Sequence, residues 1–205
     1  SRALLVNTAR SLAKGFGLRL PATVTRTFGA RALAGLPETL GTAVGGLLKQ
    51  IDSLSLEIRA YDEDIAEVAA RHPEVERLAS VPGVGTLTAT AFVLTLGRKE
   101  RFAHSRDVGS FLGLRPRQKQ SGERDPQLGI SKSGDKYLRK LLVQCAHHML
   151  GQWGRDSALR QWGLSKSGGS AAKKRAVVAV ARKLAVLLHR MWMTGESFQP
   201  FPKMV

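Results

Sequence analysis

Apolar residues recur at a regular heptad spacing between residues 44 and 68. This spacing of alternately three and four residues predicts a coiled-coil helix over residues 42–72, because a and d positions of a heptad form one continuous seam. The seam could pack on the chain's own N-terminal helix or on another chain, and the alternative is an amphipathic helix packed within its own domain. Pro73 ends the segment. The seam positions are Val44, Leu47, Ile51, Leu54, Ile58, Tyr61, Ile65 and Val68.

The N-terminal segment has an apolar phase that predicts a helix over residues 2–14, closed by Gly15 and Gly17. Residues 17–41 are punctuated by Pro21 and Pro37, which predicts a linker with small helices. The chain starts as if in the middle of a helix, and we expect it to be a fragment of a longer protein.

After the seam, residues 74–97 have the pattern of a short helix, a tight turn and an apolar helix. The turn is Pro82-Gly83-Val84-Gly85. In a helix-hairpin-helix such glycines let the backbone approach a phosphate, and the next helix presents free N–H groups to that anion. Gly83 and Gly85 are therefore candidate nucleic-acid contacts. The alternative is a plain helical hairpin that binds no ligand.

The C-terminal half is predicted to be helical around one irregular segment. A short helix is expected near Ser105, with Asp107 or Ser105 as its candidate cap, and another helix from Asp135 to about Leu150. Residues 112–130 between them should be mostly turn or irregular chain with short strands at most.

The last part is predicted to contain a polar, glycine-rich segment anchored by Trp153 and Trp162, followed by a long apolar helix over residues 171–193. The fold class is therefore mainly α: a long coiled-coil helix, then a helical domain with a helix-hairpin-helix and an irregular basic loop. The predicted domains are an N-terminal helix and linker (1–41), the coiled-coil helix (42–72), a helical domain (74–198) and a tail (199–205).

Charge narrows the class of partner. The 205 residues contain 32 Lys plus Arg against 16 Asp plus Glu, a formal charge of +16, and such an excess usually accompanies a polyanionic partner. Nucleic acid leads, ahead of an anionic membrane surface or a ribosome. Cys145 is the single cysteine, which excludes an intrachain disulfide. No apolar run is long enough for a transmembrane helix, so no membrane partner is expected.

Candidate chemistry lies in the segment "RPRQKQSGERDPQLGISKSGDKYLRK", residues 115–140. A serine that attacks a phosphodiester needs an exposed backbone and nearby cations, and Ser121 has basic neighbours on both sides. From the residues alone, a serine that only contacts phosphate is the stronger alternative. Tyr137 is a weaker nucleophile candidate, because it lies inside a helix. No histidine, cysteine or carboxylate cluster has the spacing of a metal site.

Basic and small residues around this segment and in the last helix are candidate phosphate contacts, and the alternative is a solvated face. Besides the two hairpin glycines they are Arg115, Arg117, Lys119, Gly122, Arg124, Ser131, Lys132, Lys136, Arg139, Lys140, Lys173, Lys174, Arg182 and Lys183.

Three blocks carry a family resemblance: "RLASVPGVGTLTATAFV", "FLGLRPRQKQSGERDPQLGISKSGDKYLRKLLVQCA" and "KKRAVVAVARKLAVLLHRMW". In order and spacing they resemble the C-terminal part of the DEDD transposases of insertion sequences, the "one-ten" family, which includes the related Piv-type DNA invertases. The resemblance runs from about residue 1 to residue 198.

The resemblance implies a DNA-joining enzyme of the bacterial cytoplasm and nucleoid. It implies an N-terminal RuvC-like domain that binds Mg²⁺ and is absent here, a coiled coil that assembles a dimer or tetramer, and a transposase domain over residues 74–198. It places the serine nucleophile at Ser121 and raises that assignment above the phosphate-contact alternative. Some members are guided by a bridge RNA. This fragment alone is expected to be inactive. The rival hypotheses are a non-catalytic helix-hairpin-helix module that binds nucleic acid and oligomerises, and a module that binds RNA only.

Overall fold

The computed structural model describes residues 1–20, 28–33, 36–118 and 128–202. Within these residues the regular structure is helical and contains no strand, which confirms the mainly α class. Contacts divide the chain inside its longest helix into two units, Ser1–Asp64 (unit 1) and Ile65–Val205 (unit 2). The domain boundaries drawn from the sequence stay predictions.

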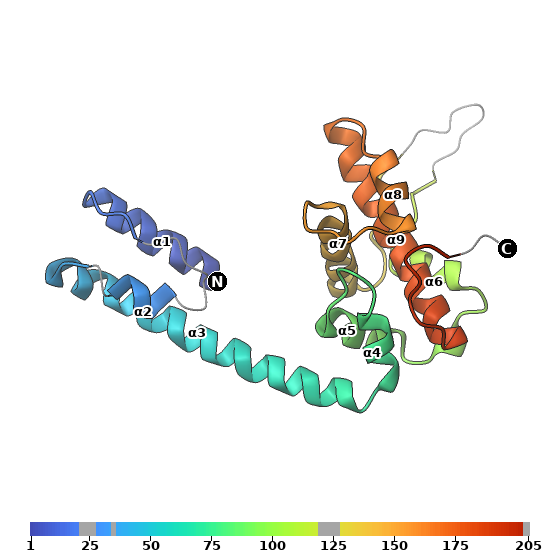
Figure 1. Ribbon diagram of the computed structural model, residues 1–205, viewed down its shortest axis with the longest axis horizontal. Coiled ribbons are helices and arrows are strands. Elements are labelled where there is room, and N and C mark those ends of the chain that lie inside the picture. The colour runs from blue at the N-terminus through green and yellow to red at the C-terminus, as the bar shows by residue number, and fades with distance from the viewer. Residues whose placement is uncertain (21–27, 34–35, 119–127, 203–205) are drawn as a thin grey trace. The chain divides into compact units, whose positions relative to one another are not determined.

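Unit 1 packs two short elements onto one long helix (Figure 1). They are α1 (Arg2–Gly15), α2 (Phe28–Leu33) and α3 (Glu38–Ala70), of which the part up to Asp64 belongs to this unit. On α1 the buried residues Val6, Ala9 and Ala13 follow the three-and-four spacing of one helix face. The core of unit 1 is Val6, Ala9, Ala13, Leu20, Phe28, Ala32, Leu40, Val44, Leu48 and Ile51.

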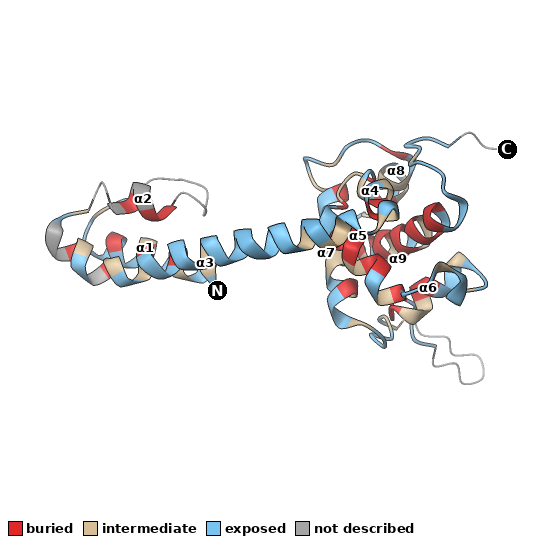
Figure 2. Ribbon diagram, turned by 90° about the horizontal axis from the view of Figure 1, so that it is seen from below, coloured by how far each residue is buried: buried red, intermediate tan, exposed pale blue. Residues whose placement is uncertain are grey.

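The predicted seam of α3 divides into a buried and an exposed part. Val44 and Ile51 lie fully in the core of unit 1, so the N-terminal part of the seam packs within its own unit. Beyond Ile51 the residues of α3 are mostly exposed, and Figure 2 shows most of this helix as exposed. Ile58 and Tyr61 expose 39% and 65% of their surface. The structure therefore does not identify what packs against the exposed part of the seam.

Unit 2 is built around the C-terminal helix α9 (Ser170–Thr194), which contacts α4, α6, α7 and α8. Figure 2 shows α9 as the most continuously buried helix of this unit. Its buried residues include Val180, Leu184 and Leu188 at one-turn spacing. The other elements are α4 (Pro73–Ala79), α5 (Thr86–Leu96), the 3₁₀ helix η2 (Lys99–Arg101), α6 (Ser105–Phe111), α7 (Lys136–Leu150) and α8 (Ala158–Ser165).

The segment around Trp162 that was predicted to be polar and glycine-rich contains the helix α8. α8 begins after Ser157, whose hydroxyl accepts a hydrogen bond of 3.2 Å from the backbone N–H of Arg160. Trp162 on this helix packs against the core of unit 2. The prediction that Trp153 is also an anchor is wrong, because its side chain is 79% exposed.

Ser105 is not the helix cap that the sequence suggested. α6 begins after His104, whose side chain makes no capping hydrogen bond. The Ser105 hydroxyl lies 2.9 Å from Nδ1 of the buried His189 instead. The other ring nitrogen of His189 donates to the Lys99 carbonyl at 2.9 Å, since a carbonyl oxygen only accepts. His189 therefore ties α9 to η2 and α6.

Across the described ranges, no helix combines the length and the hydropathy needed to span a bilayer.

Candidate nucleic-acid interface

Two short segments of unit 2 pair as an antiparallel ribbon. The ribbon consists of residues 113–117 and 129–133, and it follows α6 and precedes α7. One bridge joins Pro116 and Ile130. Three backbone hydrogen bonds hold the two segments together: Arg117 N–H to the Gly129 carbonyl (3.0 Å), Ser131 N–H to the Arg115 carbonyl (2.8 Å) and Lys132 N–H to the Gly113 carbonyl (3.0 Å).

Two glycines allow the ribbon to close against the end of α6. Gly113 and Gly134 have φ values of 67° and 78°, which favour glycine. A Cβ on Gly113 would lie 2.6 Å from the backbone nitrogen of Ser133, and one on Gly134 would collide with the Phe111 carbonyl oxygen. Lys132, with φ 59°, is the one described residue other than glycine in this backbone region. The ribbon thus has a fixed and crowded base.

Arg139 holds the base of the ribbon from α7. One guanidinium nitrogen, Nη1, donates to the carbonyls of Leu112 and Ser133, both at 2.9 Å. These carbonyls belong to the two segments that enter and leave the ribbon, so one side chain bridges both. Arg139 was a candidate phosphate contact, and the structure places this nitrogen on backbone carbonyls. Sequence reasoning gave no sign of this bridging role.

The start of α7 is fixed by Asp135. Its Oδ1 accepts a 2.6 Å hydrogen bond from the N–H of Leu138, as expected of a side chain at a helix N-cap. The helix predicted from Asp135 to about Leu150 is confirmed. Because α7 is fixed at this end, the positions of Lys136 and Lys140 relative to the ribbon are fixed as well.

Exposed cations lie along the ribbon and the adjoining helix faces. Lys136 and Lys140 are exposed and one turn apart on α7. The Arg115 guanidinium donates to Oε1 of Gln118 at 3.1 Å. Cations at these positions can contact phosphates without disturbing the core. The predicted cationic contacts that are exposed are Arg115, Arg117, Lys132, Lys136, Lys140, Lys173, Lys174 and Lys183.

Arg182 and Lys183 on α9 make contacts within unit 2. The Arg182 side chain covers Gly109 of α6 so closely that a Cβ there would lie 3.0 Å from its Cγ. The ammonium of Lys183 lies 3.7 Å from the centre of the Trp162 ring, a cation–π contact. Both cations therefore help to pack α9 against its neighbours.

The two hairpin glycines differ in their surroundings. Gly83 has φ 87°, and a Cβ there would lie 3.2 Å from the Cys145 carbonyl of α7, so it allows the turn to pack on α7. Gly85 is exposed and precedes α5, with no atom within 4 Å of an added Cβ. Of the two, Gly85 leaves room for an approaching phosphate. Phosphate binding at this hairpin stays a prediction.

Four predicted site residues, Lys119, Ser121, Gly122 and Arg124, lie outside the described residues. The chain joins their segment directly to the two sides of the ribbon. Ser131, inside the ribbon, has its hydroxyl 2.9 Å from that of Ser133.

Metal ligands are not brought together: in the described part of the chain, no three His, Cys, Asp or Glu side chains form a group that could hold a metal ion. Cys145 is buried, and burial raises the pKa of its thiol above the ordinary value of 9.0. Its thiol donates to the Thr88 hydroxyl at 3.6 Å. The residues described here do not fit a Mg²⁺ site.

Gly113 was not singled out from the sequence, although it is as crowded as Gly134. A lone glycine between Leu112 and Leu114 is the available signal, since glycine inside an apolar run often marks a bend or a close backbone approach.

Known proteins resemble this chain over most of its length. It is 29% identical over 205 residues to the transposase for insertion sequence element IS1111A of Coxiella burnetii, covering 97% of this chain and 56% of that protein. Over 104 residues it is 40% identical to the transposase for insertion sequence element IS1328 of Yersinia enterocolitica, covering 50% and 28%. The pilin gene-inverting protein of Moraxella bovis is 28% identical over 146 residues, covering 69% and 45%.

The chain spans about half the length, or less, of these relatives. The family model described as the transposase IS116/IS110/IS902 family matches residues 75–162. This range contains the helical hairpin, the ribbon and α7. Residues 75–162 are therefore similar to the domain that this transposase family model describes.

Proposed function

We propose that this chain is the DNA-joining part of a transposase, and that Ser121 is its nucleophile. The observation that carries the proposal is the ribbon within the family-matched range. Arg139 hydrogen-bonds both segments at the base of the ribbon, where Gly113 and Gly134 are closely packed. The ribbon is flanked by exposed cations, and the chain joins it to the segment that contains Ser121. A nucleophile must be positioned rigidly against a bound phosphate, because small displacements of reacting atoms slow such reactions strongly.

In the proposed step the Ser121 hydroxyl oxygen forms a bond to a DNA phosphorus atom. The bond from phosphorus to one bridging sugar oxygen breaks, and that oxygen takes up a proton in exchange for the proton the serine gives up. The product is a phosphodiester between the protein and one DNA end, which a hydroxyl of another DNA end can attack in reverse. The step conserves the phosphodiester and needs no oxidant or reductant. Cations near the ribbon would stabilise the charge of the transition state.

We assign the binding of divalent metal to a part of the protein other than this chain. We propose that acidic residues of a RuvC-like domain outside residues 1–205 bind Mg²⁺. The lack of a fitting site among the described residues is compatible with this, and no step of this chain's own chemistry is routed through the metal. A structured guide RNA is a further proposed partner, since the exposed cations fit either nucleic acid.

The apolar side of α3 beyond Ile51 is the proposed contact between copies of the chain. Ile58 and Tyr61 are exposed seam residues, and a heptad seam buries such positions against a second helix.

The test compares Ser121→Ala with Ser131→Ala in the complete gene product. With Mg²⁺ and substrate DNA, the unchanged protein and Ser131→Ala are expected to form a DNA adduct that survives denaturation. Ser121→Ala should lose the adduct and recombination but keep its affinity for DNA. Recombination without any adduct would favour the non-catalytic helix-hairpin-helix module, and an adduct in Ser121→Ala would refute the serine assignment.

A further inference from the structure

Of the three tryptophans of the chain, one lies outside the cores. Trp192 exposes 8% of its surface, and Trp162 packs against the core of unit 2. Trp153 exposes 79% of its surface, although an indole has a large apolar area whose burial would stabilise the fold. A single exposed apolar residue is ordinary on a protein surface, so the surroundings of Trp153 decide what it can do.

The turn that carries Trp153 is closed by hydrogen bonds. It lies in the connection from α7 to α8 (Figure 1). The Gly154 N–H donates to the Gly151 carbonyl at 3.2 Å, and the same carbonyl accepts a bond of 2.9 Å from Nη2 of Arg160 on α8. A Cβ on Gly154 would collide with the Met149 carbonyl oxygen of α7. Because the turn contacts both helices, it presents the indole from a defined position.

Positive charge predominates in this part of unit 2. Between residues 136 and 195 the sequence has twelve Lys and Arg against a single acidic residue, Asp156. Both oxygens of that carboxylate serve the local fold: Oδ1 accepts from the N–H of Ser157 and Oδ2 from Nε2 of Gln161, each at 3.0 Å. The partner that fits an exposed indole in such a basic region is therefore anionic.

An exposed aromatic ring beside cations suits the bases of nucleic acid. Every base has a flat π face that can stack on an aromatic side chain, while neighbouring cations hold the strand. Arg155, two residues after Trp153, is exposed and can serve as such a cation. Paired bases in a duplex are stacked on each other and present their edges, so an indole that stacks face to face requires an unpaired base.

We propose that Trp153 is a stacking platform for an unpaired base of nucleic acid. It lies within residues 75–162, the range that the transposase family model matches. The inference rests on the proposed function for one premise, that the protein binds nucleic acid, and it adds the structure that is recognised, a strand with an unpaired base. A DNA strand separated from its complement and a single-stranded RNA are the two sources of such a base.

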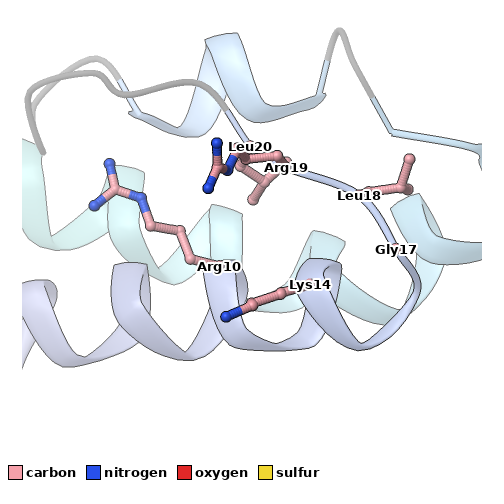
Figure 3. A pocket seen from close by; sticks show the side chains of 6 residues that line it. All are labelled: Arg10, Lys14, Gly17, Leu18, Arg19 and Leu20. Carbon is pink, nitrogen blue, oxygen red and sulfur yellow. The ribbon is translucent and has the colours of Figure 1, made fainter.

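The experiment compares Trp153→Ala with Phe16→Ala in the complete gene product. Phe16 is the control because it is an aromatic residue of unit 1 that is 71% exposed and lies outside the family-matched range. It directly precedes Gly17, where the chain turns back from α1 (Figure 3). Affinity is measured against salt concentration on a single-stranded DNA, a single-stranded RNA of the same sequence and the fully paired DNA duplex. Circular dichroism checks folding, and light scattering gives the mass.

Trp153→Ala is expected to weaken the binding of at least one single strand about tenfold, as the loss of one stacked base does. The strand that loses affinity identifies the source of the base. The salt slope should not change, because stacking neutralises no phosphate. Affinity for the paired duplex and the mass should also stay the same, and Phe16→Ala should match the unchanged protein throughout.

Two further variants separate stacking from a simple apolar contact. Trp153→Phe keeps an aromatic face and should retain most of the affinity for the single strand. Trp153→Leu keeps apolar surface without a π face and should bind as weakly as Trp153→Ala. If Trp153→Ala is misfolded, this pair of variants decides by the same comparison.

Four results would overturn the proposal: an unaltered single-strand affinity in Trp153→Ala, equal losses on single strands and duplex, equal losses in Phe16→Ala, or full affinity in Trp153→Leu. A lower mass in Trp153→Ala would overturn it as well, since a second copy of the chain would then be the partner of Trp153. Failure of the proposed function has a different signature. An unchanged protein that binds none of the three probes refutes both, whereas normal DNA joining with unaltered strand binding in Trp153→Ala refutes the platform alone.

Discussion

At the scale of single residues, the base of the ribbon depends on a position where a side chain cannot be added. Gly113 combines a positive φ with a backbone nitrogen 2.6 Å from any added Cβ. Gly113→Ala should therefore lower the free energy of unfolding by about 2 kcal/mol or more, the sum of backbone strain and a clash. Urea unfolding measures the change.

Gly129 is the matched control for that substitution. It lies on the other side of the ribbon, its φ is not positive, and an added Cβ has no neighbour within 4 Å. Gly129→Ala should change the unfolding free energy by no more than about 0.5 kcal/mol. Equal effects at the two positions would show that the crowding at Gly113 is not important for stability.

A pH effect is expected from Cys145. Burial raises the pKa of its thiol above 9.0, so the folded protein holds this proton more tightly than the unfolded chain. Its contribution to stability is full below the unfolded pKa and is lost as the pH rises through the folded one. The unfolding free energy should fall more steeply above pH 9 in the unchanged protein than in Cys145→Ala. Parallel curves would contradict the burial of this thiol.

At the scale of elements, Arg139 joins α7 to both segments at the base of the ribbon. Arg139→Ala leaves two carbonyls without their donor and should cost about 1.5–3 kcal/mol of stability. Arg139→Lys keeps the charge but not the planar group, and should recover little of the loss. Full recovery by lysine would mean that charge alone is needed there.

In contrast to Arg139, Lys136 and Lys140 on the same helix should matter for DNA binding and not for stability. Both are exposed, so replacing either by alanine should leave the unfolding free energy almost unchanged. Each replacement should weaken DNA binding across sequences and reduce the salt slope by about 1. An unchanged salt slope in the double variant would remove this face of α7 from the interface.

The exposed seam of α3 makes a prediction about assembly. Ile58→Lys with Tyr61→Lys should reduce the mass of the chain in solution, measured by light scattering, because two charges would enter a helix–helix contact. Leu4→Lys on α1 is the control, since Leu4 is also an exposed apolar residue of unit 1. Ile51 is unsuitable for this test because it lies in the core of unit 1. An unaltered mass in the double variant would mean that this part of the seam has no partner.

At the scale of the whole molecule, the sequence predicts the parts whose pattern is local. The heptad spacing predicts α3, the apolar run predicts α9, and glycines with proline predict the hairpin turn. Local spacing cannot show which part of a seam is buried, because burial of Val44 and exposure of Tyr61 depend on where α1 and α2 end. The sequence pattern did not predict α8, because this helix is short and polar residues separate its few apolar positions.

In the candidate site, too, local features could be predicted from the sequence and contacts between distant residues could not. The basic segment was identified from its composition, but the bridging role of Arg139 was not, because its carbonyl partner at Leu112 lies 27 residues away in sequence.

The most direct measurement of the central claim identifies the atom that becomes bonded to DNA. The complete gene product would react with substrate DNA and Mg²⁺, be denatured and digested with nuclease and protease, and be analysed by peptide mass spectrometry. The account predicts a nucleotide remnant on the peptide that contains Ser121, at the Ser121 hydroxyl. A remnant on Ser131 or Tyr137, or complete recombination with no remnant on any peptide, would contradict it.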